Sequence, residues 1–221
     1  MTRIEAVIFD MDGTLLDTEA LIINAGLHAL EAHGHEPRRE LLTAMVGTVG
    51  DTGDQILLDA YGPALDIEAL NHTWRAEAAR RYDAGVPLRP GAIELFDHLD
   101  ARGTPRALAT NSRTAHARES LARAGIAGRF AADLVFGRDA VARPKPAPDL
   151  FAHAARALGA DPAACLVFED SDPGVAAAVA AGMIVVQVPD QRPPETDLAH
   201  LIAPSLLDGA RHFGLLGGLS G

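Results

Sequence analysis

Cysteine and positive charge are both scarce in this sequence. The 221 residues include a single cysteine, Cys165, which rules out a disulfide within the chain and favours a reducing, cytoplasmic location. Acidic residues outnumber lysine and arginine by 30 to 19, which gives a formal net charge of −11. That balance argues against nucleic acid and against an anionic membrane as partners.

Long apolar runs are missing as well. The longest stretch, Gly174 to Val186, is shorter than the roughly 20 residues that a membrane-spanning helix needs, and Gly182 interrupts it. A signal peptide is not expected either, because Glu5, Asp10 and Asp12 break up any apolar segment near the N-terminus. The length fits one or two domains with a sizeable core.

Lysine is nearly absent. Of the 19 basic residues, Lys145 alone is a lysine, and it stands between Pro144 and Pro146, which fix the loop around it. A lysine is ordinarily a solvated surface charge. In a chain that uses arginine everywhere else, however, Lys145 indicates a role that needs a compact point charge, such as a contact with phosphate.

The opening of the chain combines a strand with two acids. Ile4 to Phe9 is an apolar, β-branched run that predicts a buried parallel strand, and Asp10, Asp12 and Gly13 follow it. Because side chains alternate along a strand, Asp10 and Asp12 are predicted to point the same way. Open α/β sheets place their sites at such strand ends. Asp and Gly are also common turn residues, so this stretch alone leaves a plain turn open.

From residue 88 onward the sequence alternates predicted helices and strands. We expect strands at 106–109, 133–136, 165–168 and 184–188, and helices at 91–101, 114–124, 148–158 and 173–181, with a helical tail from Leu198. Such alternation predicts an α/β fold, a Rossmann-like parallel sheet with helices on both faces.

Residues 17–87 contain no convincing strand. Helices are expected at about 18–33, 38–45, 51–61 and 66–82. We therefore predict an α/β core domain formed by residues 1–16 and 88–221, with an inserted α-helical domain at 17–87.

Three more polar stretches stand near the predicted strand ends. They are Thr110-Asn111-Ser112, the loop around Lys145, and Glu169-Asp170. Each alone is most simply a turn or a helix cap. Together with Asp10 and Asp12 they would place four carboxylates at one sheet edge, and such a cluster favours a divalent cation. All-oxygen ligands favour Mg²⁺, while lysine, amide and hydroxyl groups suit a phosphate.

These motifs resemble a known family. The run Asp10-Met11-Asp12-Gly13-Thr14, followed by Thr110-Asn111, Lys145 and Glu169-Asp170, resembles the four-motif signature of the haloacid dehalogenase (HAD) superfamily. The helical insertion resembles the α-helical cap of its phosphatase and phosphomutase branch. The resemblance implies a Mg²⁺-dependent hydrolase that acts on a small phosphate monoester, with a sugar phosphate expected.

The resemblance also implies a role for each motif residue. Asp10 would be the nucleophile that becomes an aspartyl phosphate, and Asp12 the general acid and base. Thr110, Asn111 and Lys145 would hold the phosphoryl oxygens. Mg²⁺ would be held by Asp10, the backbone carbonyl of Asp12 and Asp170, with Glu169 nearby.

Two alternatives remain. The β-phosphoglucomutases of the superfamily carry a histidine where this chain has Ile22 and an arginine where it has Gly50, and Arg75 could replace that arginine. Receiver domains of response regulators share a strand-end Asp, a Thr and a Lys-Pro, but they are about half this length and lack a helical insertion.

Substrate specificity would come from the helical domain. Candidates are Glu19, Thr48, Trp74 and Arg75, although each is more simply a solvated or packed helix residue. Nothing in the sequence predicts the oligomeric state.

Overall fold

The computed structural model describes residues 3–45 and 52–216. The chain divides into two compact units. The sheet unit comprises Met1–Asp17 and Leu88–Gly221, and the helical unit comprises Thr18–Pro87.

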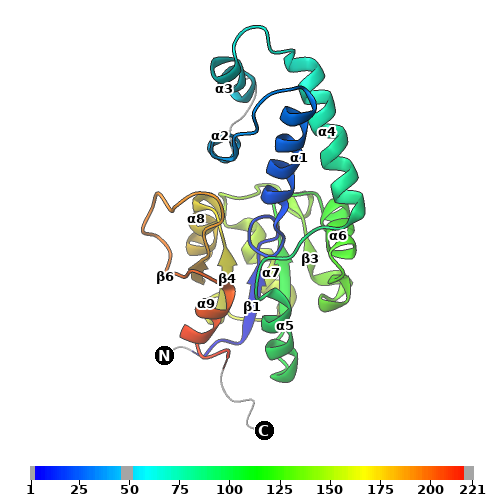
Figure 1. Ribbon diagram of the computed structural model, residues 1–221. Coiled ribbons are helices and arrows are strands. Elements are labelled where there is room, and N and C mark those ends of the chain that lie inside the picture. Colours follow the sequence, from blue (N-terminus) through cyan, green and yellow to red (C-terminus); the bar gives the residue numbers. More distant parts are fainter. Residues whose placement is uncertain (1–2, 46–51, 217–221) are drawn as a thin grey trace. The chain divides into compact units, whose positions relative to one another are not determined.

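The sheet unit is built on one parallel sheet. Its strands are β1 (Ala6–Phe9), β2 (Arg106–Ala109), β3 (Val135–Phe136), β4 (Cys165–Glu169), β5 (Ile184–Gln187) and β6 (Leu201–Ile202). They lie in the order β3-β2-β1-β4-β5-β6, and every pairing is parallel (Figure 1). The chain reverses its direction of winding between β1 and β4, which is where doubly wound sheets open a crevice for a ligand.

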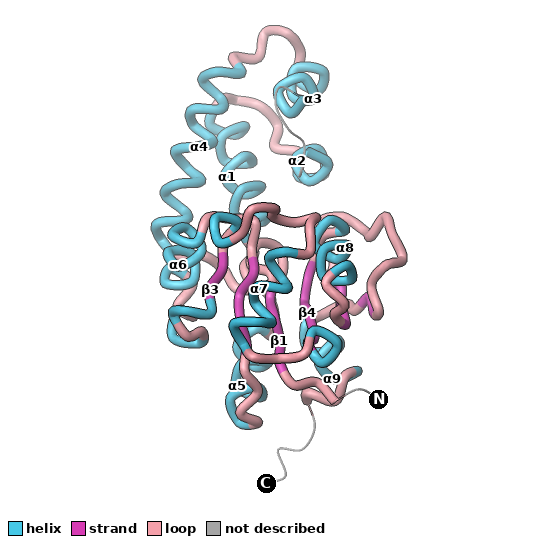
Figure 2. The backbone as a smooth tube through the Cα atoms, turned by 180° about the vertical axis from the view of Figure 1, so that it is seen from behind, coloured by secondary structure: helices cyan, strands magenta, loops and turns pink. Residues whose placement is uncertain are grey.

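Helices cover both faces of this sheet. They are α5 (Ala92–Ala101), α6 (Thr114–Arg123), α7 (Asp149–Leu158), α8 (Asp172–Ala180) and α9 (Leu206–His212). Figure 2 shows α7 in front of the sheet, whereas α5 and α9 are seen from the opposite side in Figure 1. The predicted fold class, a parallel α/β sheet with helices on both faces, is confirmed.

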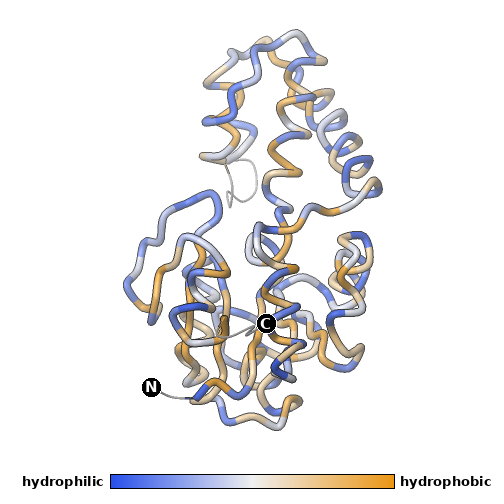
Figure 3. Tube along the Cα trace, turned by 60° about the horizontal axis from the view of Figure 1, so that its bottom comes forward, coloured by the Kyte–Doolittle hydropathy of each residue, from blue (hydrophilic) through white to orange (hydrophobic). Residues whose placement is uncertain are grey.

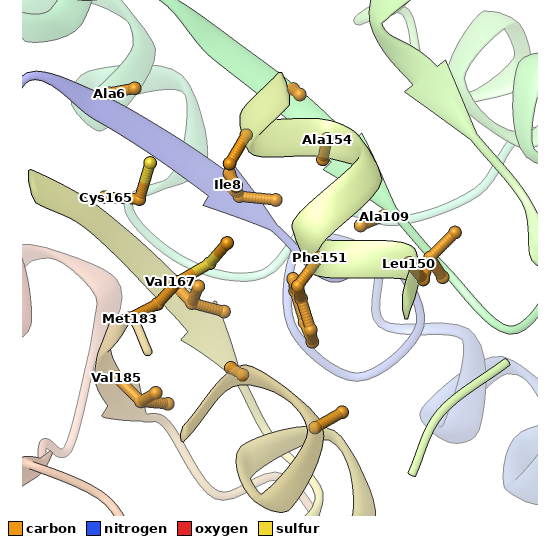
Figure 4. Close-up of a cluster of buried hydrophobic side chains, with 14 of the residues drawn as sticks. Ala6, Ile8, Ala109, Leu150, Phe151, Ala154, Cys165, Val167, Met183 and Val185 are labelled. Carbon is orange, nitrogen blue, oxygen red and sulfur yellow. The ribbon is translucent and has the colours of Figure 1, made fainter. Parts of the chain in front are cut away.

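The side chains of β1 alternate between two cores. Ala6 and Ile8 face α7 and α8 and pack with residues such as Phe151 (Figure 4). Phe9 faces the other way, where its ring stacks on Phe168 at 5.4 Å and meets Phe96 of α5 edge-on at 5.5 Å. A strand that is buried on both faces explains why its sequence is apolar throughout.

The helical unit consists, in its described residues, of four helices around their own core. They are α1 (Thr18–Ala32), α2 (Arg39–Met45), α3 (Thr52–Tyr61) and α4 (Ile67–Ala84). Hydrophobic and hydrophilic residues are mixed along the chain (Figure 3), and apolar residues of these helices, such as Leu30, Leu42, Leu57 and Leu70, pack together as the core of the unit. Gly26 lets α1 approach α4 closely, because a Cβ there would lie 2.5 Å from the Trp74 ring.

The C-terminal part differs from the prediction. We expected a helical tail from Leu198, but residues 201–202 form the edge strand β6 and the helix α9 begins only at Leu206. Ser205 caps α9 by accepting a hydrogen bond from the N–H of Asp208, at 3.1 Å. Two strand residues are too few to show an alternating hydrophobic pattern, so β6 left no period-2 signal in the sequence.

The strand expected at 133–136 is also shorter than predicted. Residues Ala132–Leu134 form a single 3₁₀ turn, and β3 covers only Val135–Phe136.

Among the described residues, no helix combines the length and apolar character that a bilayer crossing requires.

Gly137 packs where β3 meets the loop that follows β2. A Cβ on Gly137 would lie 2.6 Å from the carbonyl oxygen of Ser112, with backbone rather than a flexible side chain as the obstacle. We therefore expect Gly137→Ala to lower the free energy of unfolding by about 1–3 kcal/mol, the usual cost of overpacking. Urea denaturation measures this.

Gly128→Ala is the matched control, because a Cβ at Gly128 would meet nothing within 4 Å. We expect the control to change the free energy of unfolding by less than about 0.5 kcal/mol. Equal stability of the two variants would contradict the close approach at Gly137.

Candidate active site

Lys145 joins the two acidic strand ends. Its Nζ lies 2.7 Å from Oδ1 of Asp10 and 2.7 Å from Oε1 of Glu169, and its side chain is only 3% exposed. The same ammonium lies 4.5 Å from the centre of the Phe151 ring, whose face attracts a cation. The lysine is therefore a buried charge in the sheet unit and not a solvated surface residue.

Burial and charge act against each other in this cluster. Burial raises the pKa of Asp10 to about 8, with Lys145 opposing the rise and Glu169 adding to it. Burial alone would lower the pKa of Lys145, but Asp10 and Glu169 outweigh it, so this pKa lies above its ordinary value. Lys145 is thus held as a cation.

The amide of Asn111 holds the loop that carries Lys145. Its Nδ2 donates to the carbonyl oxygen of Lys145 at 3.0 Å, and its Oδ1 accepts from the backbone N–H of Lys145 at 3.0 Å. Asn111 therefore fixes the backbone of Lys145 through both polar atoms of its amide.

Asp12 and Thr110 are both tied to Ser112. The Ser112 hydroxyl donates to Oδ2 of Asp12 at 2.9 Å, and the backbone N–H of Ser112 donates to Oγ1 of Thr110 at 3.1 Å. Thr110 is 2% exposed, and its hydroxyl accepts in that bond, so its proton can serve another acceptor. The loop after β2 therefore orients Asp12.

Glu169 uses both carboxylate oxygens within the site. Oε1 accepts from Lys145, whereas Oε2 accepts from the backbone N–H groups of Asp170 and Ser171 at 3.0 Å each and from the Ser171 hydroxyl at 2.9 Å. A Cβ on Gly174 would overlap this carboxylate. Glu169 thus fixes the turn between β4 and α8.

Asp170 lies against the first motif. Its Oδ1 accepts from the Thr14 hydroxyl at 3.1 Å, and a Cβ on Gly13 would collide with its carboxylate. Gly13 also has φ +81°, a conformation that a residue with a side chain rarely adopts. Glycine is therefore required here both for its backbone and for the space that it leaves.

The acids can hold a metal ion. Asp10, Glu169 and Asp170 each offer a carboxylate oxygen, and these oxygens lie within 4.8 Å of one another. Oxygen donors alone suit Mg²⁺ better than zinc or copper. A cation there would also counter the rise in the pKa of Asp10, since positive charge favours the ionised carboxyl. The side chain of Asp12 is not part of this set.

Most predicted site residues lie together in the sheet unit. Lys145 directly contacts both Asp10 and Glu169. The sequence interpretation did not assign a function to Ser112 or Phe151. Ser112 could have been found from its place beside Asn111, whereas the Phe151 contact depends on the packing of α7 and left no sequence signal.

The candidates for specificity lie in the helical unit. Trp74 packs inside that unit, where its Nε1 donates to the carbonyl oxygen of Ile22 at 2.8 Å. Ile22 itself is 50% exposed, and Arg75 is exposed. Thr48 and Gly50 lie outside the described residues.

The chain matches the family model "haloacid dehalogenase-like hydrolase" over residues 4–182, and it belongs to that family. It is 36% identical to the "Probable pseudouridine-5'-phosphatase" of Drosophila melanogaster, over 97% of this chain and 96% of the relative. It is also 36% identical to the fructose-1-phosphate phosphatase YqaB of Escherichia coli, over 84% of this chain and 97% of that enzyme.

A solved structure provisionally named β-phosphoglucomutase, from Thermotoga maritima, superposes with a TM-score of 0.74 at 28% identity, over 95% of this chain and 99% of that one. Family membership and the phosphatase relatives confirm the predicted enzyme class, a phosphoric monoester hydrolase. They also exclude the receiver-domain alternative.

Gly174 offers a test of the Glu169 position. In Gly174→Ala the added methyl would overlap the Glu169 carboxylate, so we expect that carboxylate to leave its position and its bond to Lys145 to break. Leaving buried groups unpaired costs about 1–3 kcal/mol each. We expect a lower midpoint of urea unfolding and a weaker response of that midpoint to added Mg²⁺.

Gly128→Ala again serves as the control for replacing glycine by alanine. A Gly174→Ala variant with wild-type stability and a wild-type Mg²⁺ response would show that Glu169 is free to move without consequence.

Proposed function

We propose that this enzyme is a Mg²⁺-dependent phosphatase that hydrolyses a small phosphorylated metabolite, in particular a sugar phosphate, through an aspartyl-phosphate intermediate. The observation that carries the proposal is the pairing of buried Asp10 with Lys145, next to an Asp12 oriented by Ser112. In this proposal Asp10 is the nucleophile and Asp12 carries the proton.

In the first step, a carboxylate oxygen of Asp10 attacks phosphorus. A bond forms between that oxygen and phosphorus, and the bond from phosphorus to the leaving alcohol oxygen breaks. Asp12 gives its proton to the leaving oxygen as general acid. The Ser112 hydroxyl, which donates to Oδ2 of Asp12, keeps that carboxyl in one orientation.

In the second step, a water molecule attacks the phosphorus of the aspartyl phosphate. Asp12, now ionised, takes a proton from this water, and the bond from phosphorus to the Asp10 oxygen breaks. Inorganic phosphate leaves and both acids return to their starting states. Atoms and protons therefore balance over the cycle with water as the only co-substrate.

Lys145 and the loop after β2 would stabilise the transferred group. The ammonium of Lys145 is buried beside Asp10, where a charge acts more strongly than in water. The backbone N–H of Asn111 and the hydroxyl of Thr110 would donate to phosphoryl oxygens. Bound at Asp10, Glu169 and Asp170, Mg²⁺ would add positive charge against the phosphoryl oxygens.

The substrate class is inferred from the relatives. Fructose 1-phosphate and pseudouridine 5'-phosphate are both phosphorylated sugars or sugar derivatives, and the relatives named for them match most of this chain. The alternative phosphomutase chemistry would need the phosphoryl group to pass to a second sugar hydroxyl in place of water. Ile22 carries no charge that could support this phosphomutase chemistry.

The proposed location is the cytoplasm, supported by the single buried thiol of Cys165.

Product analysis tests this function. We expect purified enzyme with Mg²⁺ to release inorganic phosphate from at least one of fructose 1-phosphate, pseudouridine 5'-phosphate and β-glucose 1-phosphate, measured by phosphorus NMR. EDTA should stop the release, and added Mg²⁺ should restore it. Conversion of β-glucose 1-phosphate to glucose 6-phosphate with little free phosphate would establish the mutase instead.

Asp10→Asn tests the nucleophile. The amide has the shape of the carboxylate and its oxygen can still accept from Lys145, but it cannot form the acyl phosphate. We expect kcat to fall by several orders of magnitude, as when other enzymes lose a nucleophile. Asp133→Asn makes the same change at an exposed position of the sheet unit and should keep full activity. More than a tenth of wild-type activity in Asp10→Asn would rule out Asp10 as nucleophile.

A further inference from the structure

Gln187 is a buried polar residue at the end of β5, and it belongs to none of the four motifs. It is 1% exposed and pairs in register with Glu169 of β4. The two preceding residues, Val185 and Val186, are buried and apolar. Packing alone would favour another apolar side chain at this position, so packing does not account for the buried amide.

The amide group of Gln187 holds the turn between β4 and α8. Its Nε2 donates to the backbone carbonyl of Asp170 at 3.2 Å and to Oδ1 of Asp172 at 3.1 Å. These two bonds use both N–H groups of the amide. A flipped amide would turn its oxygen toward a carboxylate and a carbonyl, so the chemistry of the two acceptors fixes the orientation.

The other atom of the amide shows that these two bonds determine its position. Oε1 of Gln187 is buried and has no hydrogen-bond partner among the described residues. A buried acceptor without a partner is unfavourable. The two hydrogen bonds donated by Nε2 therefore outweigh the unfavourable burial of Oε1.

Asp170 is consequently held from three directions. Its backbone N–H donates to Glu169, its backbone carbonyl accepts from Gln187, and its carboxylate accepts from Thr14. The peptide groups on both sides of its Cα are therefore fixed, which limits where the carboxylate can point.

Asp172 extends the same network to a loop that follows β5. Oδ1 of Asp172 also accepts from the Thr196 hydroxyl at 3.2 Å, and Oδ2 accepts from the backbone N–H of Glu195 at 2.8 Å. Gln187 thus joins the Asp170 turn to the segment at residues 195–196.

We infer that Gln187 is a positioning residue, which sets the Asp170 carboxylate for Mg²⁺ through the Asp170 backbone and the Asp172 side chain. The inference rests on the proposed function, because it requires the cation at Asp10, Glu169 and Asp170. Residues that orient metal ligands typically contribute about 10–100-fold to metal affinity or activity.

Gln187→Met tests the inference, because methionine has a similar length but donates no hydrogen bond. The readout is the dissociation constant for Mg²⁺ measured by isothermal titration calorimetry without substrate. We expect it to rise at least about 10-fold. Activity on p-nitrophenyl phosphate should drop at low Mg²⁺ and recover at saturating Mg²⁺, with KM within about 2-fold of the wild type.

Gln191→Met is the matched control. Gln191 makes the same kind of contact nearby, because its Nε2 donates to Oδ1 of Asp190 at 2.9 Å, a bond to its own neighbour in sequence and not to the Asp170 turn. We expect this control to bind Mg²⁺ like the wild type. A Gln187→Met variant that also binds Mg²⁺ within about 2-fold of the wild type would overturn the inference alone.

A second variant, Gln187→Glu, tests the inference if Gln187→Met fails to fold. In Gln187→Glu the shape is kept, but a carboxylate would face two acceptors, so we expect an even larger loss of Mg²⁺ affinity. If neither variant unfolds cooperatively, Gln187 serves folding and the positioning role is overturned. A wild type that binds no Mg²⁺ at all would overturn the proposed function and the inference with it.

Discussion

The contact between one buried ammonium and two buried carboxylates is the constraint on which the site depends. Lys145 lies 2.7 Å from both Asp10 and Glu169, and all three are shielded from water. A buried ion pair is weak evidence for stability, because desolvation offsets most of the attraction. One positive charge also cannot balance Asp10, Glu169 and Asp170 together. A divalent cation would neutralise the residual negative charge, so the arrangement fits a binding site for such a cation.

The sheet topology explains how residues so distant in sequence meet. Because β1 is central and pairs with both β2 and β4, the turns after these three strands open at the same edge. The turn after β1 supplies Asp10 and the turn after β4 supplies Asp170. The loop before α7 brings Lys145 in from the face that α7 covers. The site therefore lies at the point where the direction of winding reverses, the usual place for a ligand in such sheets.

The regular parts of this fold were predictable from the sequence. Long helices with glycine stops were placed within about two residues. The family signature named Asp10, Lys145 and Glu169, and the fold brings Lys145 into contact with both acids. The prediction of a helical tail from Leu198 was wrong, because β6 is too short to show a period. Contacts that depend on tertiary packing were also missed. Gln187 is an example, since only the pairing of β5 with β4 brings its amide to Asp170.

The use of a single lysine follows from the shape of its environment. Arginine forms exposed ion pairs in this chain. At one of them, the planar guanidinium of Arg143 donates to both carboxylate oxygens of Asp149. At Lys145 the acceptors belong to two different residues and the Phe151 ring closes another side. A compact ammonium with three donors can reach both carboxylates and retain one donor. In the proposed reaction, a phosphoryl oxygen beside Asp10 would accept a hydrogen bond from that remaining N–H, a contact that suits a compact ammonium better than a wide, planar guanidinium.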